Sequence, residues 1–185
     1  MKKVVIYGAA SADIHNVYLE NAYKLGEKLA KKGIACITGA GKTGMMGAIN
    51  DSVLSNNGIA VGIIPKFMVS KGWIHPHLMH TFETETMHER KQLMALWADA
   101  VIALPGGVGT LEELMEIITW KQLGLYHNPI LIYNINDFYT PLVEFLNSLV
   151  DKKFLCLDYP IWQVVDNDDI LMDILGIIHT ENTEL

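Results

Sequence analysis

Short apolar runs alternate along the whole chain with longer segments in which apolar residues recur every three or four positions. Short apolar runs are typical of strands buried on both faces, and the longer period is typical of amphipathic helices. No clear period covers 65–84, where we expect an irregular loop beside the functional site. The runs predict strands at 4–7, 34–38, 59–64, 100–104, 129–133 and 161–165, and the spacing predicts helices at 18–32, 45–55, 87–97, 110–123, 139–150 and 168–178.

This alternation predicts an α/β fold, a Rossmann-like doubly wound parallel sheet with helices on both faces. With no linker or repeat, we expect one domain over 1–179 and a polar tail at 180–185. Ligands of such folds lie outside the carboxyl ends of the strands. Glycine-containing turns follow Tyr7, Thr38 and Leu104 at three predicted carboxyl ends, so the functional site is expected there.

Composition narrows the classes of partner. The chain has 185 residues, half of them hydrophobic, and a net charge of −7. An acidic chain disfavours a broad nucleic-acid surface, and no apolar run has the length needed to cross a membrane. The first apolar run is too short for a signal peptide, so we expect a cytoplasmic protein. Cys36 and Cys156 are expected to be reduced, buried thiols.

The most informative segment runs from the strand at 100–104 into a proline- and glycine-rich turn and a helix. Free N–H groups at a helix N-terminus attract anions such as phosphate, and glycines let the backbone approach closely. Glu113 would place a carboxylate beside that cradle. Thr110 and Glu113 also fit a purely structural capping box, which alone would not need the preceding turn. The predicted phosphate-binding residues are Gly106, Gly107, Val108, Gly109 and Thr110.

Two basic residues, Arg90 and Lys91, open the helix before the same strand. They could bind phosphate or another oxygen, with the guanidinium offering bidentate geometry, or they could simply be a solvated helix start. His75, His77 and His80 lie close together in the sequence, but no acidic or cysteine residue is spaced with them, so no metal site is predicted.

The turn after the second predicted strand reads G-A-G-K-T-G. It matches G-x-G-x-x-G, yet no acidic residue follows at the next strand to hold a ribose, and Cys36 stands where a P-loop needs its first glycine. A bound dinucleotide is therefore disfavoured, and a role near phosphate or in packing is preferred. Secondary site candidates from this turn and the first one are Gly8, Ser11, Gly41, Gly44 and Met46.

Two long motifs resemble the LONELY GUY (LOG) family, often labelled lysine decarboxylase-like. The P-G-G-x-G-T-x-x-E motif corresponds to 105–113, and the M-H-x-R-K motif corresponds to 87–91. The resemblance implies a phosphoribohydrolase that splits a purine nucleoside 5′-monophosphate, AMP or an N6-substituted AMP of the cytokinin type, into base and ribose 5-phosphate. It further implies a catalytic pair at Arg90 and Glu113, no metal or organic cofactor, and a homodimer.

The chain departs from this family at Gly72, where many relatives have a substrate-binding Glu, at Lys121, which replaces a common Ala, and in the first turn. These departures concern the preferred base rather than the chemistry.

We expect Glu113 to stabilise positive charge on the sugar and to orient water, with Arg90 keeping it ionised. Alternatives are a nucleotide or molybdenum-cofactor carrier, a decarboxylase, for which no pyridoxal signature is found, and a broader nucleotide nucleosidase.

Overall fold

The computed structural model describes residues 1–156 and 159–181. Seven parallel strands form one sheet in the order β4-β3-β2-β1-β5-β6-β7, so the predicted doubly wound fold is confirmed. The elements are β1 (Lys3–Tyr7), α1 (Asn16–Lys31), β2 (Ala35–Thr38), α2 (Gly44–Ser55), β3 (Ala60–Pro65), α3 (Lys66–Val69), β4 (His80–Thr84), α4 (Met87–Trp97), β5 (Ala100–Ala103), α5 (Val108–Gln122), β6 (Ile130–Tyr133), a 3-10 turn (Ile135–Asp137), α6 (Thr140–Asp151), β7 (Gln163–Val165) and α7 (Asp168–Glu181).

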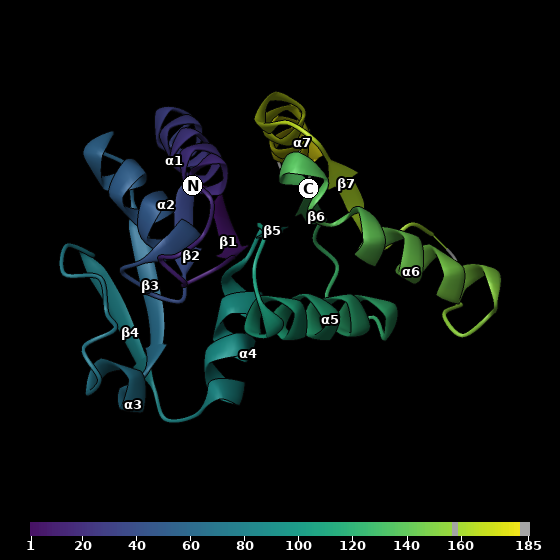
Figure 1. Cartoon of the computed structure of the whole chain (residues 1–185), viewed down its shortest axis with the longest axis horizontal. Coiled ribbons are helices and arrows are strands. Elements are labelled where there is room, and N and C mark those ends of the chain that lie inside the picture. Colours follow the sequence, from purple (N-terminus) through teal and green to yellow (C-terminus); the bar gives the residue numbers. More distant parts are fainter. Residues whose placement is uncertain (157–158, 182–185) are drawn as a thin grey trace.

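Strand order reverses between β1 and β5 (Figure 1). The chain runs outward from β1 to β4 on one side and then returns to place β5 on the other side of β1. The loops that leave β1 and β5 therefore diverge at their carboxyl ends, which is where doubly wound folds bind ligands. The turn at 104–109 lies at this switch point, as the sequence predicts.

The helices form two layers around the sheet (Figure 1). Because successive strand residues point to opposite faces, Val4 and Ile6 of β1 pack with α1, α2 and α7, whereas Val5 and Tyr7 pack with α4, α5 and α6. Both faces of the central strands are buried, which explains why these strands have no alternating polar residues in the sequence.

The segment 65–84 differs from the expected irregular loop. It contains the short helix α3 and the edge strand β4, which pairs with β3 from His80 to Thr84. Most β4 side chains are exposed or half-buried, so this strand lacks the apolar run that identifies the central ones. Cys156 is exposed rather than buried, whereas Cys36 is buried as expected. Thr180 and Glu181, expected to belong to the polar tail, instead end α7, and the rest of that tail at 182–185 lies outside the described residues.

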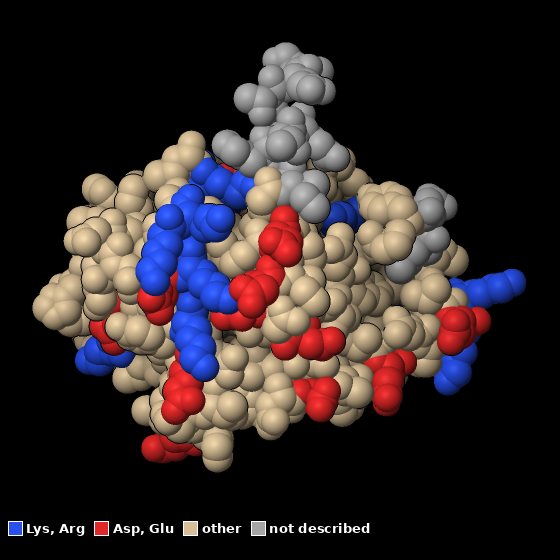
Figure 2. Space-filling view, turned by 90° about the horizontal axis from the view of Figure 1, so that it is seen from above, with Lys and Arg blue, Asp and Glu red and all other residues tan. Residues whose placement is uncertain are grey.

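Charge on the helical face over α1 and α7 is mixed (Figure 2). Basic side chains gather there among carboxylates, and Lys28 of α1 bridges Asp168 and Asp169 of α7 at 3.0 and 2.6 Å. Such exposed pairs contribute little to stability individually. Among the described residues, no helix is long and apolar enough to span a bilayer.

Candidate active site

Backbone and side-chain hydrogen bonds join the turns that follow β1, β2 and β5. The Ala9 amide donates to the Pro105 carbonyl at 3.1 Å, and the Met46 amide donates to the Ala9 carbonyl at 3.2 Å. The Thr43 hydroxyl donates to the Ala10 carbonyl at 2.6 Å. Three segments far apart in the sequence therefore form one connected rim at the carboxyl edge of the sheet.

Gly44 shows why this rim needs glycine. Its φ is +65°, and a Cβ there would overlap the carbonyl oxygens of Ala9 and Ser11. A larger residue would push the β1 turn away from α2. Of the secondary candidates, Gly41 and Met46 line a pocket at this rim, Gly44 and Gly8 shape its backbone, and Ser11 is exposed.

The N-terminus of α5 lies beside this rim. Gly107 is the N-cap, and no side chain caps the helix, so the capping-box interpretation is wrong: Thr110 lies inside the first turn. Its hydroxyl lies so close to Gly106 that a Cβ on that glycine would overlap it. Val108 is 84% exposed. The first amides of a helix have no intrahelical acceptor, so the amides at this uncapped start of α5 can bind an anion.

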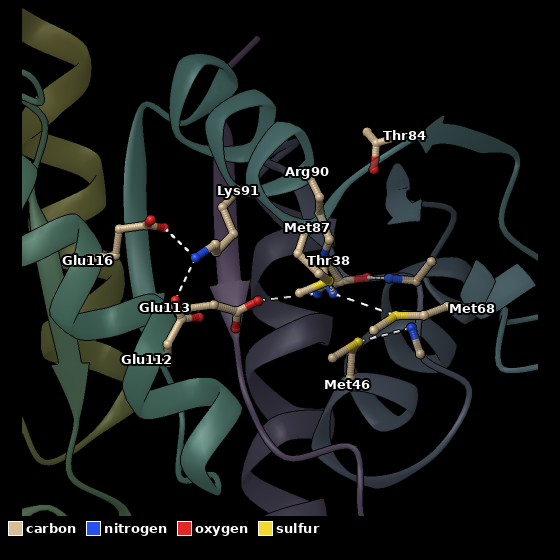
Figure 3. Close-up of polar contacts among 12 residues, drawn as sticks. Thr38, Met46, Met68, Thr84, Met87, Arg90, Lys91, Glu112, Glu113 and Glu116 are labelled. Carbon is tan, nitrogen blue, oxygen red and sulfur yellow. Dashed lines mark hydrogen bonds and ion pairs between the residues drawn. The ribbon is translucent and has the colours of Figure 1, made fainter. Parts of the chain in front are cut away.

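Arg90 of α4 and Glu113 of α5 form a buried ion pair (Figure 3). Arg90 Nη2 donates to Glu113 Oε1 at 3.2 Å, and the two side chains are only 7% and 10% exposed. The structure thus joins the two residues that the sequence analysis assigned to catalysis, although they come from different helices. Gly39 makes room for the guanidinium, because a Cβ there would overlap Arg90 Nη2.

The guanidinium of Arg90 has unused hydrogen-bonding capacity. Its Nε is buried and has no partner among the described residues. In the part of the chain that the structure describes, its Nη1 contacts only the sulfur atoms of Met68 and Met87, at 3.9 and 3.8 Å, and thioether sulfur is a weak acceptor. A buried cation with so few strong acceptors is costly unless a ligand supplies them.

Burial raises the pKa of Glu113 above its usual value, and Arg90 opposes this shift without cancelling it. Arg90 favours the ionised form of Glu113, as expected, but desolvation outweighs the attraction of the guanidinium, so the pKa lies above its usual value. Raised carboxyl pKa values beside a cation in a cleft are typical of acid–base groups.

A pocket of about 370 Å³ adjoins Arg90. Its walls are largely apolar, and Lys42 at its rim donates to the Gly72 carbonyl at 2.6 Å. Several lining residues carry no signal in the sequence, since they become neighbours only when the β2 turn, β3 and the segment after α3 meet. The lining residues are Ala10, Gly39, Gly41, Lys42, Thr43, Met46, Ile64, Met68, Trp73 and Arg90.

Lys91 does not line this pocket. Its ammonium group pairs with Glu112 at 2.5 Å and with Glu116 at 3.0 Å, on the side of α4 facing α5 (Figure 3). The lysine side chain is only 6% exposed.

The histidines at 75, 77 and 80 do not converge on a metal-binding geometry. His75 is buried and bonds Asp51 at 3.0 Å. Within residues 1–156 and 159–181, no three His, Cys, Asp or Glu side chains are arranged to hold a metal ion.

Sequence comparison identifies the relatives of this chain. The family described as "Possible lysine decarboxylase" matches residues 46–175. The cytokinin riboside 5′-monophosphate phosphoribohydrolase LOG of Oryza sativa subsp. japonica is 36% identical over 157 residues, which cover 85% of this chain and 65% of the rice protein. The enzyme LOG7 of Arabidopsis thaliana is 36% identical over 154 residues, 83% of this chain and 71% of that protein. The chain belongs to the LOG family.

Solved structures agree with the fold of this LOG-family chain. A structural-genomics target designated TM1055 is 25% identical with a TM-score of 0.74, covering 95% of this chain and 99% of the other. The molybdenum cofactor carrier protein of Chlamydomonas reinhardtii has a TM-score of 0.75 at 18% identity, covering 97% of this chain and 98% of that one. At that identity the likeness concerns the fold alone. The chain spans about two thirds of the length of the rice LOG relative.

Proposed function

We propose that this LOG-family chain is a phosphoribohydrolase. It hydrolyses the N-glycosidic bond of a purine nucleoside 5′-monophosphate, AMP or N6-substituted AMP, to free base and ribose 5-phosphate. The observation that carries the proposal is the buried Arg90–Glu113 pair beside the uncapped N-terminus of α5. A site built only to bind a phosphate gains nothing from a buried carboxylate nearby, whereas glycoside cleavage requires one.

Each group has a role in this reaction. The amides of Val108, Gly109 and Thr110 hold the 5′-phosphate, which anchors the nucleotide away from the reacting bond. Glycosidic cleavage develops positive charge on the ribose, which the ionised Glu113 stabilises. The water that Glu113 orients and deprotonates bonds to C1′ as the C1′–N bond breaks, and the base leaves with the bonding electron pair and receives that proton. Arg90 uses its free N–H groups on ribose or phosphate oxygens while its Nη2 positions Glu113.

The pocket beside Arg90 receives the base. Met46, Ile64, Met68 and Trp73 give it flat and flexible apolar walls suited to a purine ring. Its size lies within the usual range for small-molecule sites of about 300–1,000 Å³. The proposed reaction is a hydrolysis without any change of oxidation state, and the proposal assigns its acid–base and charge-stabilising roles to side chains and backbone amides, with no metal or organic cofactor.

A homodimer is part of the proposal. Leu96, Leu123 and Leu125 are more than half exposed around the α4–α5 pair. Leu96 and Leu125 line a second pocket together with Trp120 and Tyr126. A second copy covering this face would bury the exposed leucines. We further place the protein in the cytoplasm, which suits its two free thiols.

A base-release assay tests the proposal. The purified protein is incubated with AMP, its N6-isopentenyl derivative, CMP and GMP, and free base and ribose 5-phosphate are quantified. Release from the two adenine nucleotides supports the proposal, and equal release from CMP and GMP would indicate a broader nucleotide nucleosidase. Tight binding without release would indicate a carrier, and release of carbon dioxide from an amino acid would indicate a decarboxylase.

A further inference from the structure

Lys91 lies next to the catalytic pair but faces a different set of groups. It follows Arg90 directly in α4, and its ammonium group contacts Glu112 and Glu116, which precede and follow Glu113 in α5. Residues four apart lie on the same side of a helix, so the carboxylates of Glu112 and Glu116 can both pair with this one lysine. The Lys91–Glu112–Glu116 cluster therefore joins the two helices that carry Arg90 and Glu113.

The cluster is built to hold its geometry. Lys91 is almost fully buried, while Glu112 and Glu116 are 53% and 25% exposed. Two carboxylates at hydrogen-bond distance neutralise the buried ammonium group of Lys91 in its present position. Turning toward the pocket would break both ion pairs. By contrast, the Arg90–Glu113 contact is single and 3.2 Å long, so by itself it fixes the orientation of Glu113 weakly.

We infer that Lys91 is a positioning residue. Its ion pairs with Glu112 and Glu116 hold the first turns of α5 against α4, so that Glu113 faces Arg90 and the sugar. The inference rests on the proposed phosphoribohydrolase function and differs from a role for Lys91 in contacting the nucleotide. It predicts that losing Lys91 lowers turnover and leaves nucleotide binding nearly unchanged. A lysine that binds the phosphate would show the reverse.

The cluster also acts on the charge of Glu113. The charged and titratable groups near enough to influence this carboxyl are Arg90 and Lys91 from α4, Glu112 and Glu116 from its own helix, and Tyr7 from β1. The two cations lower the pKa of Glu113, and the two carboxylates raise it. Neutralising Lys91 therefore moves the acid limb of the activity profile to higher pH.

The test compares Lys91→Met with Lys91→Arg, with the Glu112→Gln/Glu116→Gln double variant and with the triple variant. Steady-state turnover of AMP is measured across pH, and AMP binding is measured by calorimetry. Lys28→Met is the matched control, because Lys28 also bridges two helices through two carboxylates but lies on the other face of the sheet.

We expect Lys91→Met to lower kcat on the order of 10²-fold with Kd for AMP changed by less than about threefold, and its acid limb to move to higher pH. Lys91→Arg restores most of kcat. The kcat of the triple variant is no lower than that of Lys91→Met, because both variants remove the same ion pairs. Lys28→Met stays near wild type. A weakened Kd with unchanged kcat in Lys91→Met, or additive losses in the triple variant, would overturn the inference.

Hydrogen exchange of the α5 amides keeps the inference testable without catalysis. Lys91→Met is expected to speed exchange over 108–116, whereas Lys91→Arg and Lys28→Met are not. If the wild-type protein releases no base, the proposed function fails while this comparison still decides the role of Lys91. Should Lys91→Met not fold, Lys91→Arg and Glu116→Gln provide the same comparison, and unchanged exchange in Glu116→Gln would contradict the inference.

Discussion

Replacing Glu113 by Gln separates the chemistry of this carboxyl from its role in the fold. The substitution keeps the shape of the side chain and leaves one oxygen that can accept from Arg90 Nη2, which lies 3.2 Å away in the ion pair. It removes the negative charge and the basicity that the proposed mechanism requires. Loss of a general acid–base group lowers turnover by about 10²–10⁴-fold, and we expect a kcat loss in that range.

The stability cost should be small by comparison. Removing one partner of a buried ion pair outright costs about 3–5 kcal/mol, because the other charge is left unpaired. Gln retains the acceptor, and burial already disfavours the ionised form of Glu113, which raises its pKa. We therefore expect a loss of about 1–2 kcal/mol, or about 2–8 °C in Tm for a domain of this size.

The assay follows base release from AMP and AMP binding by calorimetry. Glu144→Gln, the same change at an exposed position of α6, serves as the control and should leave both unchanged. Near-normal turnover of Glu113→Gln would refute the assignment of Glu113. A large fall in Tm with turnover lost in proportion to unfolded protein would show that its role is structural.

Three further predictions follow from the same geometry. Burial raises the pKa of Glu113, and the ionised form is the active one, so kcat/KM should fall as pH drops through a pKa higher than that of an ordinary glutamate. A fall in kcat/KM only at or below about pH 4.3 would contradict this. Gly106→Ala should weaken AMP binding at least tenfold, since its added Cβ would overlap Thr110. Gly107→Ala, whose added Cβ has open space around it, should bind AMP within a few-fold of wild type. Similar AMP affinities of the two variants in calorimetry would refute the proposed phosphate cradle. Treatment with EDTA should leave turnover unchanged, and a loss that a divalent cation restores would show that the reaction needs a metal.

The sequence predicts the central sheet well because its strands are buried on both faces. Such strands are short apolar runs between amphipathic helices, and β1, β2, β5 and β6 all have this form. The edge strand β4 escapes detection since one side of it faces solvent, and its H-T-F-E-T sequence has no apolar run. Its pairing with β3 is a tertiary contact that no local pattern records.

The candidate site, like the fold, is only partly predictable from the sequence. The glycine-rich turn indicates the α5 site and Glu113 beside it, because turn chemistry is visible locally. The basic helix start leaves the role of Arg90 open, and only the resemblance to the LOG family assigns it to catalysis. The start of α5 is misplaced by two residues, since Thr110 and Glu113 imitate a capping box while Gly107 takes the cap. The four-residue spacing of Glu112 and Glu116 is visible in the sequence, but their partner Lys91 lies in another helix and becomes known only from the packing.

The central claim is that one crevice holds the 5′-phosphate on the first amides of α5 while the side chain at position 113 faces the anomeric carbon. A crystal structure of Glu113→Gln with bound AMP tests it most directly. The account predicts phosphate oxygens within hydrogen-bond distance of the amides at 108–110, and the residue 113 side chain about 3–3.5 Å from C1′ or from a water aligned with it. A phosphate bound away from α5, or a ribose turned away from residue 113 and Arg90, would contradict it.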